Sequence, residues 1–291
     1  MDDTGNHIPF RKMNGLGNDF VVLDARARAI PMNEDIAAAI SNRQTGIGCD
    51  QLIIIETDKT ADAFMRIHNA SGGEVEACGN ATRCIGDILM NENDASSTTI
   101  RTIAGMLICS RAAEPGMITA DMGTPKLRWD QIPIAEEMDT RLIELQIGPI
   151  DDPILHSPSV VNVGNPHCIF WVDDVDAYDL ETIGPMLEHH PMFPERANIS
   201  LAHITSPEDI TLKVWERGVG LTKACGSAAC AVVVAASRKN ITGRKATVHL
   251  PGGNLIIEWR EDDDHILMSG PYEYEFDGTL PDALFDTMVS S

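Results

Sequence analysis

Short apolar runs rich in β-branched and aromatic side chains recur along both halves of the chain. Runs of this length, bounded by Gly, Asn, Asp and Pro, predict β-strands. The predicted strands are 20–24, 52–56 and 64–69 in the first half and 160–163, 168–172 and 210–216 in the second. Both halves are therefore expected to be built mainly from short strands joined by turns.

Two longer segments with helical composition each follow a glycine. They are NATRCIGDILMNEN after Gly79 and SAACAVVVAASRKN after Gly226. The second is apolar on nearly every face until Ser237-Arg238-Lys239, where cations favour a helix C-terminus. A helix that is apolar all round must be enclosed by other elements. We therefore predict an α+β fold in which each half is a mixed β-sheet curled around one central helix.

The tripeptide Ala-Cys-Gly occurs twice, and its cysteines, Cys78 and Cys225, are 225 − 78 = 147 residues apart. A single Gly-Asn or Cys-Gly match would mean little, because such turn residues are frequent. Several matches in one register predict two pseudo-symmetric halves that arose by duplication. We expect these halves to be 1–125 and 126–271, with the tail 272–291 joining the first. The same offset relates Asn18 to Asn165, Gln51 to Asn198 and Asn69 to Glu216.

Composition narrows the classes of function. The chain has 291 residues, a formal net charge of −22 and a pI near 4.6, so nucleic acid and anionic membranes are unexpected partners. The acidic start lacks signal-peptide character, and the longest apolar run, Ala228–Ala236, is too short to span a bilayer. Seven cysteines without a CxxC pair indicate neither a disulfide framework nor a common zinc site. These features predict a cytoplasmic chain with reduced thiols and no bound metal.

Cys78 and Cys225 are both predicted to lie at the start of a helix. Unpaired N–H groups and the helix dipole stabilise a thiolate there and lower a cysteine pKa from about 8.5 to roughly 3.5–7.5. The same N–H groups can bind a carboxylate. A paired thiolate and thiol are what an enzyme needs to move a proton between the two faces of a carbon. The other cysteines are expected to be buried small hydrophobes: Cys49, Cys84, Cys109, Cys168 and Cys230.

Six segments resemble the diaminopimelate epimerase family, in the family's order and over nearly the whole chain. Departures are small: Ala81-Thr82 follows CGN where Gly-Ala is more usual, and Ser227-Ala228 follows ACG in place of Thr-Gly. The resemblance implies an isomerase that interconverts LL- and meso-diaminopimelate without pyridoxal phosphate or metal. It would act in bacterial lysine and peptidoglycan precursor biosynthesis. The segments are KMNGLGNDFVVLD (12–24), GIGCDQL (46–52), EVEACGNATRC (74–84), GNPHC (164–168), ERANIS (195–200) and WERGVGLTKACGSAACA (215–231).

The resemblance also implies a role for each site residue. In one direction Cys78 would donate a proton and Cys225 would accept one. His167 and Glu216 match positions that tune the cysteine pKa values, although His167 fits equally a histidine satisfied beside a turn. The α-carboxylate would be held by backbone N–H groups of Gly79, Asn80, Gly226 and Ser227, and the α-amino group by Asn18 and Gln51. The distal amino-acid end would be held by Asn69, Asn165, Asn198, Glu216 and Arg217.

Other functions remain open from the sequence. A proline or hydroxyproline racemase of the same fold also uses paired cysteines, but the residues assigned to the distal end would then have no purpose. Phenazine-type isomerases lack the cysteine pair. A thiol redox-sensing binding protein is a different class, because two facing sulfurs can form a disulfide. The family commonly forms homodimers, and Phe276 stands where some members have a dimer-contact tyrosine.

Overall fold

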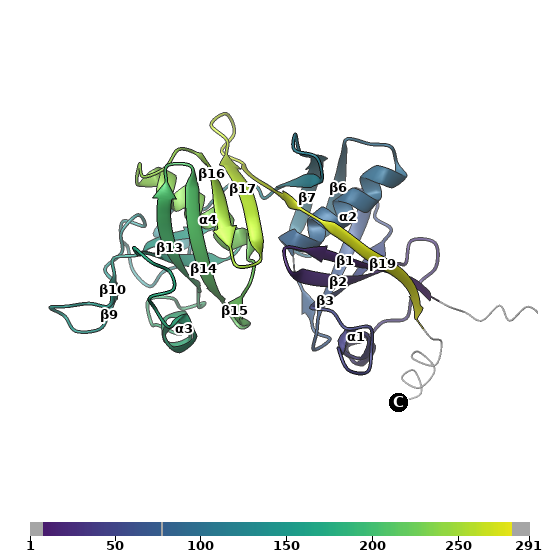
Figure 1. The fold of residues 1–291 in the computed structure, drawn as a ribbon, viewed down its shortest axis with the longest axis horizontal. Helices are drawn as coiled ribbons and strands as arrows, with labels where there is room; N and C mark the ends of the chain where they lie inside the picture. Colours follow the sequence, from purple (N-terminus) through teal and green to yellow (C-terminus); the bar gives the residue numbers. More distant parts are fainter. Residues whose placement is uncertain (1–7, 77, 281–291) are drawn as a thin grey trace, which may run out of the picture. The chain divides into compact units, whose positions relative to one another are not determined.

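A computed structural model describes residues 8–76 and 78–280, which form two compact units (Figure 1). The described residues up to Ala120 and those from Gly270 onward form the first unit, and Asp121–Ser269 form the second. Within these described residues, no helix combines the length and the apolar character that crossing a membrane requires.

The first unit is a mixed sheet with two helices. Its elements are β1 (Ile8–Gly15), β2 (Asn18–Asp24), α1 (Glu34–Ser41), β3 (Gln51–Glu56), β4 (Ala63–Asn69), β5 (Glu74–Val75), α2 (Gly79–Glu92), β6 (Ser97–Thr102), β7 (Gly105–Arg111), β8 (Met117–Asp121) and β19 (Glu273–Leu280). The spatial order is β19–β1–β2–β3–β4–β6–β7, and β5 also pairs with β4. The β2–β3 and β4–β6 pairs are parallel, so this unit combines hairpins with crossover connections.

The second unit repeats this plan. Its elements are η1 (Trp129–Gln131), β9 (Gln146–Ile147), β10 (Leu155–His156), β11 (Ser159–Asn162), β12 (Pro166–Trp171), α3 (Leu180–Glu188), β13 (Asn198–Ser206), β14 (Asp209–Glu216), β15 (Gly220–Thr222), α4 (Gly226–Arg238), β16 (Lys245–Leu250), β17 (Gly253–Trp259) and β18 (Ile266–Pro271). The order is β11–β12–β13–β14–β16–β17–β18, with β15 beside β14 and parallel pairs at β12–β13 and β14–β16. Strands β9 and β10 pair separately.

The two units share the register of their paired strands as well as the order of their elements. Phe20 pairs with Gln51 where β2 meets β3, and His167 pairs with Asn198 where β12 meets β13. Each partner in the second unit lies 147 residues beyond its counterpart, the offset that separates Cys78 from Cys225. The polar landmarks of the sequence therefore occupy equivalent strand positions in the two units.

The central helices are enclosed as the apolar pattern predicts. Every residue of α2 from Asn80 to Met90 is buried, and so is every residue of α4 from Ala228 to Ala236. Helix α2 contacts β1, β6 and β7, and helix α4 contacts strands from β11 to β17. A Cβ at Gly86 would lie 2.9 Å from Cys109 Cβ, so glycine allows α2 to approach β7. The predicted α+β fold, a mixed sheet around a central helix, is confirmed.

A shorter helix covers the opposite face of each sheet. In the first unit, Ile36 and Ile40 of α1 pack on Val21, Leu23 and Leu52. In the second unit, Leu180 and Leu187 of α3 pack with Leu201 and other strand residues. Strand β19 pairs with β1 along its length (Figure 1), while residues 281–291 of the predicted tail lie outside the described residues. Each sheet is thus buried on both faces.

Candidate active site

Cys78 is the N-cap residue of α2. Its backbone is extended (φ −146°, ψ 110°), and its Sγ accepts a hydrogen bond from the Ala81 N–H at 3.5 Å. The Asn18 amide nitrogen lies 3.8 Å from the same sulfur. The Thr82 hydroxyl donates to the Cys78 carbonyl at 2.8 Å and fixes the first turn. The thiol therefore lies among N–H donors at the positive end of a helix, as the sequence predicts.

Asn18 and Gln51 present unused acceptors beside this cysteine. Asn18 is the first residue of β2, and Gln51 is the first residue of the parallel neighbour β3. In the part of the chain that the structure describes, the buried Asn18 Oδ1 and Gln51 Oε1 accept no hydrogen bond. Buried amide oxygens are rarely left unpaired in native proteins. Two such oxygens favour a ligand that donates hydrogen bonds, such as an ammonium group.

An ion-pair network, which we call the aspartate clasp, lies directly beside Asn18 and Gln51. The clasp consists of Lys12, Asp19, Arg43 and Asp50. Asp19 accepts from the buried Lys12 ammonium and from Arg43, which also binds Asp50 at 2.8 Å. The backbone N–H of Asp19 donates to Asp50 Oδ2 and that of Asp50 to Asp19 Oδ1, both at 3.1 Å. Asp19 follows Asn18 and Asp50 precedes Gln51, so the clasp fixes the backbone on which both amides are carried. Sequence reasoning missed it.

Arg83 is another residue that the sequence analysis did not single out. Its side chain is fully buried one turn into α2, where its guanidinium donates to Asn80 Oδ1 at 2.9 Å and to the Pro271 carbonyl at 3.1 Å. The Asn80 side chain is thus engaged by Arg83. An arginine one turn into a helix that is expected to be enclosed by a sheet was the available signal, because such residues are rarely buried without partners. The backbone N–H groups of Gly79 and Asn80 remain the groups expected to bind a carboxylate.

Asn69 lies at the end of β4, where it pairs across the strands with Gln51. Its Oδ1 accepts from the Ser71 N–H at 3.0 Å and from the Ser71 hydroxyl at 2.7 Å. These bonds form a turn that carries the Asn69 side chain. The first unit therefore brings Asn18, Gln51 and Asn69 to one end of neighbouring strands.

Cys225 is the N-cap residue of α4 and has nearly the same backbone conformation as Cys78 (φ −132°, ψ 107°). Its Sγ lies 3.4 Å from the Ser227 hydroxyl. Burial raises the pKa of the Cys225 thiol well above its usual range, and the nearby Glu216 carboxylate adds to this effect. Hydrogen bonds from Ser227 and Ala228 act in the opposite direction. The expected lowering of the Cys225 pKa is therefore wrong for this structure, because burial and a neighbouring anion outweigh the helix terminus.

Glu216 and Arg217 lie at the turn between β14 and β15. The Thr222 hydroxyl donates to Glu216 Oε1 at 2.5 Å, and burial raises the pKa of the Glu216 carboxyl. The Arg217 N–H donates to Asn198 Oδ1 at 3.0 Å, while its guanidinium donates to the Glu195 carbonyl at 2.8 Å. A carboxylate and a guanidinium therefore occur on adjacent residues, which suits a ligand with an ammonium and a carboxylate.

Asn198 and Asn165 both have side-chain partners inside the second unit. Asn198 is buried, and its Nδ2 donates to the Pro166 carbonyl at 2.9 Å while its Oδ1 accepts from Arg217. Asn165 Oδ1 lies 2.8 Å from His167 Nε2. In this structure Asn198 orients Arg217, and Asn165 orients His167.

His167 is completely buried on β12. Burial lowers the pKa of His167 to about 3, and the Arg217 charge contributes further, so the ring is neutral at physiological pH. Nε2 contacts Asn165 Oδ1, which can only accept, so Nε2 carries the proton. The buried Nδ1 accepts no hydrogen bond from the described residues. His167 therefore offers an unused acceptor nitrogen.

The other cysteines are all buried, as predicted. Burial raises the pKa of the Cys84 and Cys109 thiols to about 12 and raises the pKa values of Cys49 and Cys168 as well. Such thiols are neutral at physiological pH and behave as small hydrophobes.

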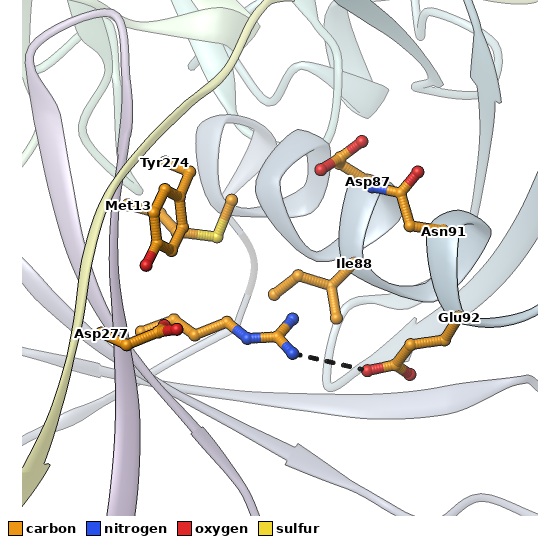
Figure 2. A pocket seen from close by; sticks show the side chains of 8 residues that line it. Met13, Asp87, Ile88, Asn91, Glu92, Tyr274 and Asp277 are labelled. Atoms are coloured by element: carbon orange, nitrogen blue, oxygen red, sulfur yellow. Dashed lines mark ion pairs between the residues drawn. The ribbon is translucent and has the colours of Figure 1, made fainter.

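A cavity of about 480 Å³ in the first unit lies apart from these residues (Figure 2). It contains the ion pair between Arg11 and Glu92, whose atoms are 4.0 Å apart. Among the residues of α2 that line the cavity, Asp87 is the closest in sequence to Cys78. It lies nine residues after Cys78, which corresponds to roughly 13 Å along the helix axis. The cavity is therefore distinct from the cluster around Cys78.

The sequence is similar to proteins of one known family along nearly its whole length. The family described as diaminopimelate epimerase matches residues 10–128 and 159–275, two stretches of similar length. A diaminopimelate epimerase of Rhodopseudomonas palustris is 53% identical over 279 residues, which cover 95% of this chain and 96% of that protein. One of Nitrobacter hamburgensis is 51% identical over 292 residues, covering 99% of this chain and all (100%) of that protein.

Among solved structures, a phenazine biosynthesis protein of the PhzF family from Bacillus anthracis superposes with a TM-score of 0.67 and 15% sequence identity. The alignment covers 94% of this chain and 99% of that chain, and at this identity it shows a shared fold alone. The two curated relatives are far more similar and match end to end. The chain therefore belongs to the diaminopimelate epimerase family.

Proposed function

We propose that this chain interconverts LL- and meso-diaminopimelate by a two-base proton transfer at the α-carbon. The observation that carries the proposal is the equivalence of Cys78 and Cys225. Each caps the central helix of its unit with nearly the same backbone conformation, in a chain of this family. In one direction the Cys225 thiolate removes the α-proton, and the Cys78 thiol donates its own proton to the opposite face. The two sulfurs exchange charge states in each turnover, so the reverse reaction starts from the opposite pairing.

The ends of two helices would hold the α-carboxylate. Backbone N–H groups of Gly79, Asn80, Gly226 and Ser227 lie in the first turns, where a helix binds anions. These donors would also stabilise the negative charge that develops when the α-proton leaves. The unpaired oxygens of Asn18 and Gln51 suit the α-ammonium group.

Cys225 must lose its proton before it can act as a base. Its pKa is raised in the structure, and Glu216, which is hydrogen-bonded to it, also has a raised pKa. A bound ammonium would supply a positive charge that lowers the thiol pKa. We therefore propose that Glu216 tunes the Cys225 pKa, and that His167 does the same for the reacting pair through its free Nδ1.

The distal end of the substrate would be recognised by its charges. Arg217 suits the distal carboxylate through paired N–H donors, and Glu216 suits the distal ammonium. Asn69, Asn165 and Asn198 would complete this recognition. A proline-type racemase needs no such residues, and the family membership also favours diaminopimelate over that alternative and over a redox-sensing binding protein.

We also propose that the protein acts in lysine biosynthesis as a cytoplasmic homodimer. The halves 1–125 and 126–271 of each chain would derive from a duplication. Phe276 supports the dimer, because it is half exposed on β19, the strand that pairs with β1. Size-exclusion chromatography with light scattering tests the stoichiometry. A Phe276→Ala variant that remains dimeric would remove this residue from the proposed contact.

Incubation of the protein with LL-diaminopimelate, followed by chiral chromatography, tests the proposed activity. We expect the meso isomer to appear, to persist after exhaustive chelation and to be lost on thiol alkylation. Binding without conversion would indicate a binding protein. Conversion that a chelator abolishes would indicate a metalloenzyme.

A further inference from the structure

The turn that carries Glu216 and Arg217 is held by hydrogen bonds from the backbone N–H groups of its last three residues, 217–219. The Val219 N–H donates to the Glu216 carbonyl at 3.0 Å and closes the turn. Gly218 has φ +74°, which the third position of a type II turn requires. The N–H of Arg217 donates to a side-chain amide, and that of Gly218 donates to a carboxylate. The turn is therefore fixed by side chains from outside the hairpin.

The carboxylate is Glu188, the last residue of α3, which is 3% exposed. Its Oε1 accepts from the Gly218 N–H at 3.1 Å, and its Oε2 accepts from Trp215 Nε1 at 2.8 Å. Arg196 Nη1 lies 3.7 Å from Oε1. Glu188 thus binds the residue before Glu216 and the residue after Arg217.

This position is an unfavourable one for a carboxylate. The C-terminus of a helix carries partial negative charge, and a buried anion needs good partners to offset its desolvation. Glutamine has a similar shape but a single acceptor oxygen, so it could satisfy one of the two N–H donors. Because the two N–H groups reach different oxygens of Glu188, only a carboxylate accepts from both in this geometry.

The packing around Trp215 keeps the two donors in place. A Cβ added to Gly184 of α3 would lie 2.6 Å from the Trp215 ring, so glycine lets the ring rest directly on the helix. The indole N–H is thereby directed to the end of the same helix, where Glu188 lies.

We propose that Glu188 is a positioning residue for recognition of the distal amino-acid end of the substrate. With its own carboxylate held by Trp215, Glu188 binds the Gly218 N–H and so sets the direction of the Arg217 guanidinium that precedes this residue. The Glu216 carboxylate is held separately by the Thr222 hydroxyl. This inference rests on the proposed function. Because the distal end does not change during proton transfer, Glu188 should influence substrate binding far more than the chemical step.

The test compares Glu188→Gln with Glu181→Gln, the same substitution at an exposed position of the same helix. Epimerisation of LL-diaminopimelate gives kcat and KM, and thermal unfolding reports stability. We expect Glu188→Gln to raise KM about tenfold with kcat within about twofold, since one charge-assisted hydrogen bond is lost. Glu181→Gln should match the wild type in both constants.

An unchanged KM in folded Glu188→Gln, or a fall in kcat as large as the rise in KM, overturns the assignment. If Glu188→Gln fails to fold, Trp215→Phe keeps an aromatic ring at this position and removes one bond to the carboxylate. It should raise KM about threefold, and an unaltered KM would again overturn the assignment. A wild-type protein that leaves LL-diaminopimelate unchanged sinks the proposed function and this role together, whereas an active wild type with an unaffected variant sinks only this role.

Discussion

The two cysteines differ in what surrounds each sulfur, although each caps a helix. Cys78 Sγ is near the Asn18 amide and the Ala81 N–H. Cys225 Sγ is buried near Ser227 and Glu216, and its pKa is raised by burial first and by the Glu216 carboxylate second. A two-base enzyme needs one thiolate and one thiol at a time, and unlike surroundings favour that unequal charge state.

Alanine at either cysteine should abolish epimerisation while the fold survives. Cys78→Ala and Cys225→Ala each remove a group that transfers a proton, so kcat should fall by at least about 10³-fold. Circular dichroism and thermal unfolding check the fold. Cys168→Ala, at a buried cysteine outside the proposed chemistry, is the control and should keep kcat. Near-normal turnover in either active-site variant contradicts the two-base mechanism.

Glu216→Gln should change the pH profile as well as the rate. The Glu216 charge raises the pKa of Cys225, after burial, so its removal should lower that pKa. The thiolate then forms at lower pH, and the ascending limb of kcat/KM against pH should move toward acid. The maximum of kcat/KM should fall about tenfold, because one contact to the distal ammonium is lost. An ascending limb that stays in place or moves toward alkali would refute the tuning role.

At the scale of elements, the central helices and the strand ends do most to position the proposed site. Helix α2 begins at Cys78, and the β2 and β3 strands begin at Asn18 and Gln51. The aspartate clasp joins the starts of these two strands through charges. Burial raises the pKa of Asp19, but hydrogen bonds from Arg43 and Lys12 outweigh burial and hold that pKa well below its usual range.

Asp19→Asn should destabilise the first unit by about 3–5 kcal/mol, because it leaves the buried Lys12 ammonium without its partner. The depressed pKa of Asp19 means that its contribution is complete above the unfolded value near 4, begins to fall just below it and is lost only as pH approaches the much lower folded-state pKa. Urea unfolding at pH 7 and at pH 3.5 measures both effects. The difference between wild type and variant should shrink at the lower pH.

Asp130→Asn is the control, since Asp130 forms an exposed pair with Arg128. Its urea midpoint should match that of the wild type. An Asp19→Asn midpoint equally close to the wild type would show that the clasp does not support the strand ends.

At the scale of the whole chain, one plan is used twice with different side chains. The two units share strand order and register, yet the clasp has no counterpart in the second. At the same offset of 147 residues, Asp19 corresponds to Pro166 and Asp50 to Ala197. There, the hydrogen bond from Asn198 to the Pro166 carbonyl joins the equivalent strands. Equivalent backbones are therefore stabilised by charge in one unit and by an amide in the other.

The arrangement of strands and central helices could largely be predicted from the sequence, because it follows from the spacing of apolar residues and from the internal repeat. The apolar run from Ala228 to Ala236 predicts an enclosed helix, and the 147-residue offset predicts equivalent strand positions. The family resemblance pointed to Glu216 as a residue that tunes the cysteines, but the raised pKa of Cys225 could not be predicted, because it depends first on how deeply tertiary packing buries the sulfur. Glu188 was missed because its partners are distant in sequence, and the same holds for the bond from Arg83 to the Pro271 carbonyl.

Isotope incorporation during the first turnovers in D₂O tests the two-base claim most directly. LL-diaminopimelate is incubated with the wild-type protein to less than about a tenth of full conversion, and both isomers are analysed by mass spectrometry. We predict that the meso product carries one deuterium at the inverted carbon, because it comes from a solvent-exchanged thiol, while the remaining LL substrate carries none. A meso product that keeps its original proton would mean that one base removes and returns it, and would contradict the assignment of Cys78 and Cys225 to opposite faces.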